Sequence, residues 1–166
     1  LVEGIIDQQY MIYLQDEIHG SNALSSDIEI FPYDGADNVK NNILMKFVKE
    51  KFKKIVVTVD LDRFSDVKKA VTSSGFIENI DFFGIGINES GKKCIEGLIP
   101  ACVYKSVFEK NFTLVQKSQF TTGTEQKSFK NDLKLKFLEE FKSTPICKET
   151  HKDFYDLTKK LNRAFK

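Results

Sequence analysis

Two pairs of carboxylates stand where the chain is expected to leave a strand. Glu3 and Gly4 follow a short apolar start, and Asp7 comes four residues after Glu3. Asp60 and Asp62 close the segment IVVTVDLD. Carboxylates held close together repel each other, and a divalent cation relieves that repulsion. Oxygen ligands without a nearby His or Cys-x-x-Cys favour Mg²⁺ or Mn²⁺ over Zn²⁺, so the pattern predicts a metal site.

The elements that must position these carboxylates alternate between strand and helix. The run KKIVVTVDLD (53–62) is the strongest strand candidate, since its nearly continuous β-branched residues favour coverage on both faces and a parallel or mixed sheet. Such alternation predicts an α/β sheet, which binds ligands at the carboxyl ends of its strands. The other expected strands cover 1–2, 27–31 and 79–87, and the expected helices cover 6–18, 36–52 and 65–74.

Three expectations depend on this arrangement. If residues 1–2 run parallel to 55–60 as their neighbour, Glu3 emerges beside Asp60 and Asp62. Period two places the latter two side chains on one face of the strand. Gly4 would permit a tight turn and the close approach of a phosphate, and Asp7, one helical turn further, would point back over the same crevice.

Finer predictions concern the helices. Helical spacing turns Val39, Ile43 and Phe47 inward, with Met45 or Phe52 as a further inward position. Ser65 is the expected N-cap of the helix that ends before Gly75. After Pro100 we expect a loop over 117–128 and amphipathic helices over 128–142 and 150–165. We therefore divide the chain into a core, 1–100, and a mainly helical extension, 101–166.

Composition limits the class of protein. The chain is 41% hydrophobic with 15 Phe, enough for a folded core, and has no apolar run near the roughly 18 residues that span a bilayer. Three cysteines without Cys-x-x-Cys spacing predict buried thiols in a reducing cytoplasm. Residues 1–99 hold 11 Lys and Arg against 16 Asp and Glu, whereas residues 100–166 hold 14 against 8. The net negative N-terminal part suits binding of cations, and the net positive C-terminal part suits binding of a polyanion.

VEGIIDQQYMIYL, followed about fifty residues later by IVVTVDLDRF, resembles the Toprim domain of topoisomerases, primases and several nucleases. The Glu-Gly-x-x-Asp form and GKKCIEGLIP resemble OLD-family (overcoming lysogenization defect) nucleases most. The resemblance implies a Rossmann-like Toprim sheet that is mostly parallel and flanked by helices. Topoisomerases and primases usually carry a third acidic residue and a Gly after Asp-x-Asp. Here Arg63 and Phe64 follow Asp62, and this departure argues against those two classes.

Site roles are carried over from this resemblance. It implies Glu3 as metal ligand or general base, Asp7, Asp60 and Asp62 as ligands, and Glu96 as a second-site ligand, with an ordinary surface glutamate as the alternative for Glu96. Two Mg²⁺ or Mn²⁺ ions would then serve phosphodiester hydrolysis. The family also places a lysine at the scissile phosphate. Three lysines share one helical face by their spacing, Lys127, Lys130 and Lys134, and of these we choose Lys130.

The resemblance further implies a DNA endonuclease in phage defence, with an ABC-type ATPase domain upstream in the same chain and no membrane contact. A start at Leu1, inside an expected strand, fits an excised segment, and a homo-oligomer through the upstream part stays open. The alternatives are an RNA-cutting Toprim protein resembling ribonuclease M5, a non-catalytic Toprim-like module and a generic α/β domain.

Four further residues have ordinary structural explanations. A turn and a helix N-cap explain Asp34 and Asp37 in PYDGAD. His19 is expected to end a helix, and His151 to lie at the surface.

Overall fold

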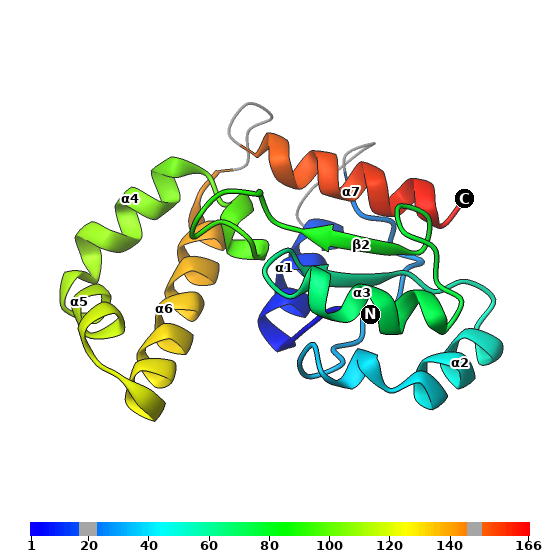
Figure 1. Ribbon diagram of the computed structural model, residues 1–166. Coiled ribbons are helices and arrows are strands. Elements are labelled where there is room, and N and C mark those ends of the chain that lie inside the picture. Colours follow the sequence, from blue (N-terminus) through cyan, green and yellow to red (C-terminus); the bar gives the residue numbers. More distant parts are fainter. Residues whose placement is uncertain (17–22, 146–150) are drawn as a thin grey trace. The chain divides into compact units, whose positions relative to one another are not determined.

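The computed structural model describes residues 1–16, 23–145 and 151–166 (Figure 1). The chain divides into two units. Leu1–Leu98 together with Phe154–Lys166 form the first, which we call the sheet unit, and Ile99–Asp153 form the second, the helical unit. The sequence analysis placed 101–166 in one helical extension, whereas the last helix packs into the sheet unit.

A parallel sheet organises the sheet unit and makes the chain an α/β protein. β1 (Val57–Asp60) pairs in parallel with β2 (Phe82–Ile85), with Asp60 opposite Ile85 at the carboxyl end. Leu1 runs along the other edge of β1, since its nitrogen donates to Val56 O (2.6 Å) and its carbonyl accepts from Thr58 N (3.0 Å). This alternation of bonds is that of a parallel neighbour, so the predicted adjacency of residues 1–2 and this strand is confirmed.

The expected strand over 27–31 is wrong. A single parallel bridge joins Val2 to Pro32, with Phe31 O accepting from Val2 N and Val2 O accepting from Tyr33 N, each at 2.9 Å. Both bonds to Val2 come from the residues on either side of Pro32, so the missing N–H of the proline does not disturb this contact. The chain beside Val2 nevertheless extends the parallel arrangement by one more segment.

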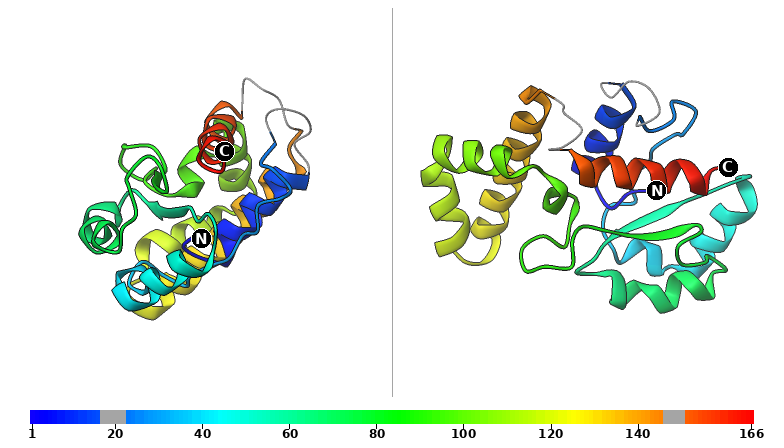
Figure 2. Two further views of the ribbon diagram at one scale, coloured as in Figure 1. Left: turned by 90° about the vertical axis from the view of Figure 1, so that its right-hand side faces the viewer. Right: turned by 90° about the horizontal axis from the view of Figure 1, so that it is seen from above.

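Helices cover both faces of the sheet (Figures 1 and 2). α2 (Asn42–Lys51) and α3 (Phe64–Ser73) pack on the face to which Val57 and Val59 contribute. α1 (Ile5–Asp16) and α7 (Lys152–Ala164) lie on the other face, where Met11 and Leu161 meet Val56 and Thr58. Successive residues of β1 thus alternate between two cores, as period two requires.

The helix expected over 36–52 is broken at Asn41. A short 3₁₀ turn, η2 (Asn38–Lys40), precedes it, and the Asn41 side chain then accepts from Leu44 N (3.1 Å) and starts α2 afresh. The restart rotates the helix, so Met45 is buried while Ile43 is 84% exposed and Phe47 is 53% exposed. The inward placement of Ile43 and Phe47 is therefore wrong, and that of Val39 is confirmed.

Capping of α3 differs from the prediction at one end only. Arg63, not Ser65, occupies the N-cap position, and no side chain caps the first turn. Gly75 follows the helix with φ +89°, a left-handed conformation that favours glycine.

Three helices build the helical unit: α4 (Ala101–Lys110), α5 (Phe112–Phe120) and α6 (Gly123–Ser143). The expected loop over 117–128 is wrong, because α5 and α6 take up all of it except Thr121 and Thr122. The polar residues of 117–128 mostly occupy exposed positions on these helices. The turn between α5 and α6 leads into Gly123, which has φ +67°.

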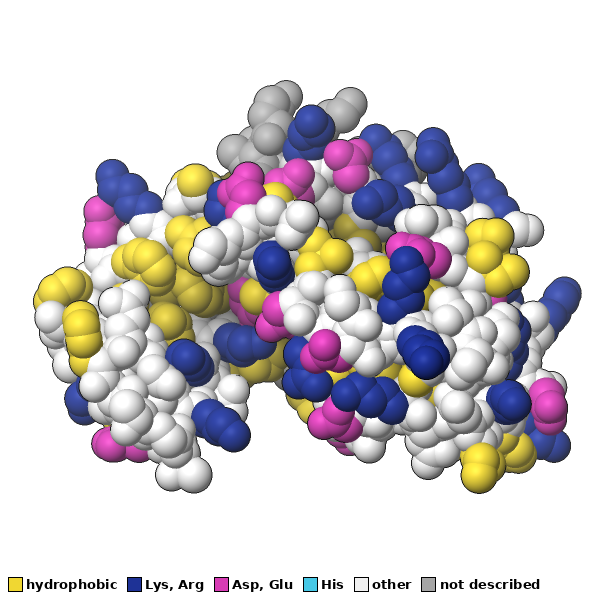
Figure 3. Space-filling model, viewed as in Figure 1, with side chains coloured by type: hydrophobic (Ala, Val, Ile, Leu, Met, Phe, Trp, Pro, Cys, Tyr) yellow, Lys and Arg dark blue, Asp and Glu magenta, His cyan; other side chains and the backbone are white. Residues whose placement is uncertain are grey.

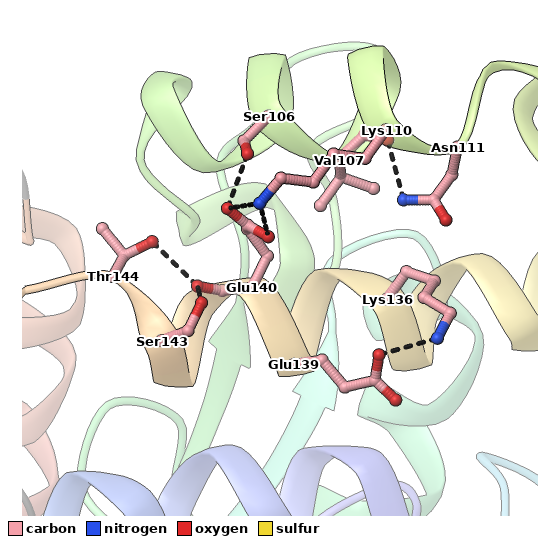
Figure 4. Close-up of polar contacts among 9 residues, drawn as sticks. All are labelled: Ser106, Val107, Lys110, Asn111, Lys136, Glu139, Glu140, Ser143 and Thr144. Carbon is pink, nitrogen blue, oxygen red and sulfur yellow. Dashed lines mark hydrogen bonds and ion pairs between the residues drawn. The ribbon is translucent and has the colours of Figure 1, made fainter.

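A polar network joins α4 to α6 (Figure 4). The Glu140 carboxylate accepts from Lys110 Nζ (2.8 and 2.9 Å) and from Ser106 Oγ (2.5 Å). Hydrogen bonds from Lys110 and then Ser106 hold the pKa of Glu140 below its ordinary value. Beside it, the rings of Tyr104 and Phe137 pack edge to face with centroids 4.7 Å apart.

Several side-chain predictions have separate outcomes. His151 is fully buried, with its ring centroid 5.3 Å from that of Phe141, so its placement at the surface is wrong. Cys102 is exposed and Cys94 half-buried, so the expectation of buried thiols fails for Cys102. His19 and Cys147 lie outside the described residues. No helix among 1–16, 23–145 and 151–166 is long and apolar enough to cross a membrane.

Candidate metal centre

Glu3 and Asp60 lie on neighbouring segments at the carboxyl end of the sheet. Glu3 follows the residues that run beside β1, and Asp60 is the last residue of that strand. The two are in contact, since Glu3 Oε2 accepts from the Asp60 backbone N–H at 3.4 Å. Gly35 N also donates to Glu3 O (2.9 Å), which ties the next loop to this edge.

Asp7 reaches the same edge from the first turn of α1. By period two, Asp60 continues the face of Val56 and Thr58, which is the face that α1 covers. Asp7 Oδ2 accepts from Gly4 N–H at 2.8 Å, and Gln8 N donates to Gly4 O at 3.0 Å. This is the return bond of a capping box, with the carboxylate at the positive end of the helix dipole. Asp7 thus has a structural role whether or not it binds metal.

The chain itself does not require a glycine at position 4. Gly4 is not among the residues with positive φ, and an added Cβ would lie 3.5 Å from Asp7 Oδ2, an ordinary contact. The chain does bend at Gly4 before α1, but this bend has no positive φ that would call for glycine, and the close approach of a phosphate stays a prediction.

Tyr33 is a site residue that the sequence analysis missed. Its hydroxyl donates to Thr58 O (2.8 Å) on β1. Burial raises the pKa of Tyr33 far above its ordinary value, and the negative charges of Glu3, Asp60 and Asp7 raise it further. The Tyr33 hydroxyl thus lies within electrostatic reach of three of the predicted ligands, Glu3, Asp60 and Asp7. The available signal was an aromatic residue at the end of the segment FPY, next to Asp34.

Asp62 does not lie on the strand. β1 ends at Asp60, and Leu61 to Arg63 form a turn in which Leu61 N donates to Ile85 O and Arg63 N to Asp60 O, both at 3.0 Å. The period-two argument for Asp60 and Asp62 is therefore wrong. Asp62 is exposed beyond the strand end.

Glu96 lies on η3 (Ile95–Leu98) and is only 4% exposed, so its interpretation as a surface glutamate is wrong. The loop before it folds back tightly, because a Cβ on Gly97 would collide with the backbone of Lys92. The same loop reaches the end of β1, where Lys93 O accepts from Asp62 N at 3.3 Å. Glu96 thus belongs to a loop attached to the acidic edge, and its role as a ligand stays a prediction.

Lys130 lies on the exposed surface of α6 in the helical unit, as does Lys127, and Lys134 is half-buried. The role of Lys130 at a phosphate stays a prediction. In the sheet unit, Asp34 occupies a turn with φ +56°, and Asp37 is the N-cap residue of η2. Both fit the explanations expected for them.

The candidate ligands fit Mg²⁺ or Mn²⁺ by donor type. All five are carboxylates, which hard divalent cations take as ligands. Neither Glu3 nor Asp62 forms an ion pair with a described residue. Among residues 1–16, 23–145 and 151–166, no three acidic, His or Cys side chains converge as closely as in a preformed metal centre. Glu3, Asp7 and Asp60 lie at one edge without converging on a point, and a cation would have to draw their carboxylates together against their repulsion.

Comparison with known proteins yielded no match to a family model, a curated protein or a solved structure. The resemblance to Toprim nucleases accordingly rests on the motifs quoted above.

Proposed function

We propose that this chain is a Toprim-type nuclease domain that hydrolyses DNA phosphodiesters with Mg²⁺ or Mn²⁺. The observation that carries the proposal is the contact between Glu3 and Asp60 at the carboxyl end of a parallel sheet, with Asp7 in the helical turn that follows Glu3 directly. A purely structural edge has no need for three carboxylates, which destabilise one another without a cation.

Two such ions, when bound, supply an activated water and stabilise the leaving oxygen of an in-line displacement. Glu3, Asp7 and Asp60 are the residues that would hold them, with Asp62 and Glu96 completing the set. By the resemblance, Glu3 would also act as the general base. By the same resemblance, Lys130 contacts the phosphate, and an upstream ATPase domain couples the activity to phage defence.

Basic surface supports a polyanionic substrate. α7 carries Lys152, Lys159, Lys160 and Arg163 on its exposed side, where dark blue side chains gather in Figure 3. Most of this helix belongs to the same unit as the acidic edge. Such a surface neutralises backbone phosphates without reading sequence.

The test is cleavage of supercoiled plasmid in Mn²⁺, Mg²⁺ or EDTA. Asp60→Asn removes one charge at nearly constant volume. Asp27→Asn is the matched control, because Asp27 is exposed beside Val56 at the amino end of β1. We expect metal-dependent nicking or cutting by the wild type and the control, and none by Asp60→Asn.

Three results would contradict the proposal. Cleavage by Asp60→Asn at the wild-type rate would remove the site from the chemistry. Cutting of structured RNA but not of plasmid would assign the chain to the RNA-cutting alternative. Absence of both cleavage and Mn²⁺ binding would leave a non-catalytic module.

A further inference from the structure

Arg63 is the cation that the fold places directly at the acidic edge. It follows Asp62, its backbone N–H donates to Asp60 O (3.0 Å), and it occupies the N-cap position of α3. Its side chain is 40% exposed. Unlike Lys130, it belongs to the same unit as the candidate metal ligands.

The present partners of Arg63 are two exposed carboxylates, Asp37 before η2 and Asp66 in the first turn of α3 itself. Nη2 lies 3.5 Å from Asp37 Oδ1, and Nε lies 3.3 Å from Asp66 Oδ2. Asp37 is 80% exposed and has a shorter contact, 2.7 Å, to Lys40. Exposed ion pairs of this kind contribute little to stability, so exchanging them costs little.

Two features suit this position to a phosphate. The guanidinium carries five donors in a planar fork that matches phosphate oxygens, and only two of its nitrogens make these ion-pair contacts. α3 also begins without a side-chain cap, and the N–H groups of a first helical turn favour an anion, although Asp66 already places one carboxylate in this turn. An acidic edge repels DNA unless a cation at its rim receives the backbone.

We propose that Arg63 binds a phosphate of the DNA strand beside the acidic edge, exchanging its contact with Asp37 for that phosphate. This inference rests on the proposed function and names the residue that docks the substrate. Asp37 then acts as a competitor that holds the guanidinium at the rim until DNA arrives.

The test measures binding of a short fluorescent DNA duplex by anisotropy, with Ca²⁺ in place of Mg²⁺ or Mn²⁺. Arg63→Gln should weaken binding about tenfold, since it removes a charge-assisted bidentate contact, and should lower the salt slope of log K by about 1. Lys69→Gln, on the exposed side of α3, is the matched control with the same loss of charge. Asp37→Asn should tighten binding, because it removes the competitor.

Weaker DNA binding by Arg63→Gln together with tighter binding by Asp37→Asn distinguishes phosphate binding by Arg63 from a structural role. Equal binding by Arg63→Gln and the wild type, or equal weakening by Arg63→Gln and Lys69→Gln, would overturn the assignment. Weakening by Asp37→Asn would also overturn it, because the Arg63–Asp37 contact would then be structural. Mn²⁺ calorimetry on the wild type reports separately on the proposed function: a chain that binds Mn²⁺ and DNA but shows no effect of Arg63→Gln overturns the inference alone, and one that binds neither Mn²⁺ nor DNA overturns both.

Discussion

Asp7 allows its structural and its metal-binding roles to be measured apart. Its Oδ2 accepts from Gly4 N–H at 2.8 Å, which is a helix-capping bond. Asp7→Asn keeps an acceptor oxygen at this place and loses the charge, whereas Asp7→Ala loses both. The two variants therefore differ mainly in the cap.

The magnitudes follow from this geometry. Loss of a cap costs about 1 kcal/mol, and loss of a negative charge at a helix N-terminus costs about 0.3–1 kcal/mol. In Asp7→Asn, relief of repulsion with Glu3 and Asp60 offsets the second cost, so its free energy of unfolding should stay within about 0.5 kcal/mol of wild type. Asp7→Ala should lose about 1 kcal/mol more than Asp7→Asn.

Urea unfolding measures the capping role of Asp7, and Mn²⁺ titration calorimetry measures its role as a metal ligand. Both variants should bind Mn²⁺ at least about tenfold more weakly, since even the partners of ligands matter by that factor. Asp16→Asn, at the exposed far end of α1, is the control and should bind as the wild type does. Wild-type affinity in Asp7→Asn would show that Asp7 is a helix cap and no ligand. Equal instability of the two variants would refute the capping argument.

Three other predictions concern the stability of each unit, two in the sheet unit and one in the helical unit. Gly86→Ala should lower the free energy of unfolding by about 1–3 kcal/mol, because Gly86 has φ +112° and its Cβ would lie 2.6 Å from the backbone carbonyl carbon of Lys93; thermal unfolding measures this, and an unchanged melting temperature would contradict it. Tyr33→Phe should lower the free energy of unfolding, measured in urea, by about 1 kcal/mol. Because the pKa of Tyr33 is raised, this loss of stability should be present below the ordinary tyrosine pKa of about 10 and shrink above it. Glu140→Gln should cost up to about 1 kcal/mol at neutral pH. Because Lys110 lowers the pKa of Glu140, that cost should fade as the pH drops below the ordinary glutamate value and through the lowered one; a pH-independent cost would refute the assignment.

β1, β2 and the acidic edge could be predicted because their signals are local, whereas the strand expected over 27–31 did not form. A continuous β-branched run specifies β1 wherever it packs, and a parallel sheet with Glu3 and Asp60 at its carboxyl end follows from the order of elements. The direct neighbour of β1 was predictable for the same reason: Leu1 and Val2 are apolar and lead straight into Glu3.

Other features depended on single side-chain bonds that periodicity does not encode. The Asn41 cap rotated α2, so Ile43 faces solvent although its spacing fits a core position. The turn after Asp60 removed Asp62 from the strand. Tyr33 entered the site through a long-range hydrogen bond to β1, which a pattern of nearby residues cannot contain.

Mn²⁺ titration calorimetry on the wild type and Asp60→Asn tests the central claim most directly, because it requires neither DNA nor a further domain. The account predicts saturable binding by the wild type and by Asp27→Asn, and binding at least about tenfold weaker by Asp60→Asn. Absence of binding by the wild type, or equal binding by all three, would contradict a metal centre at the end of β1.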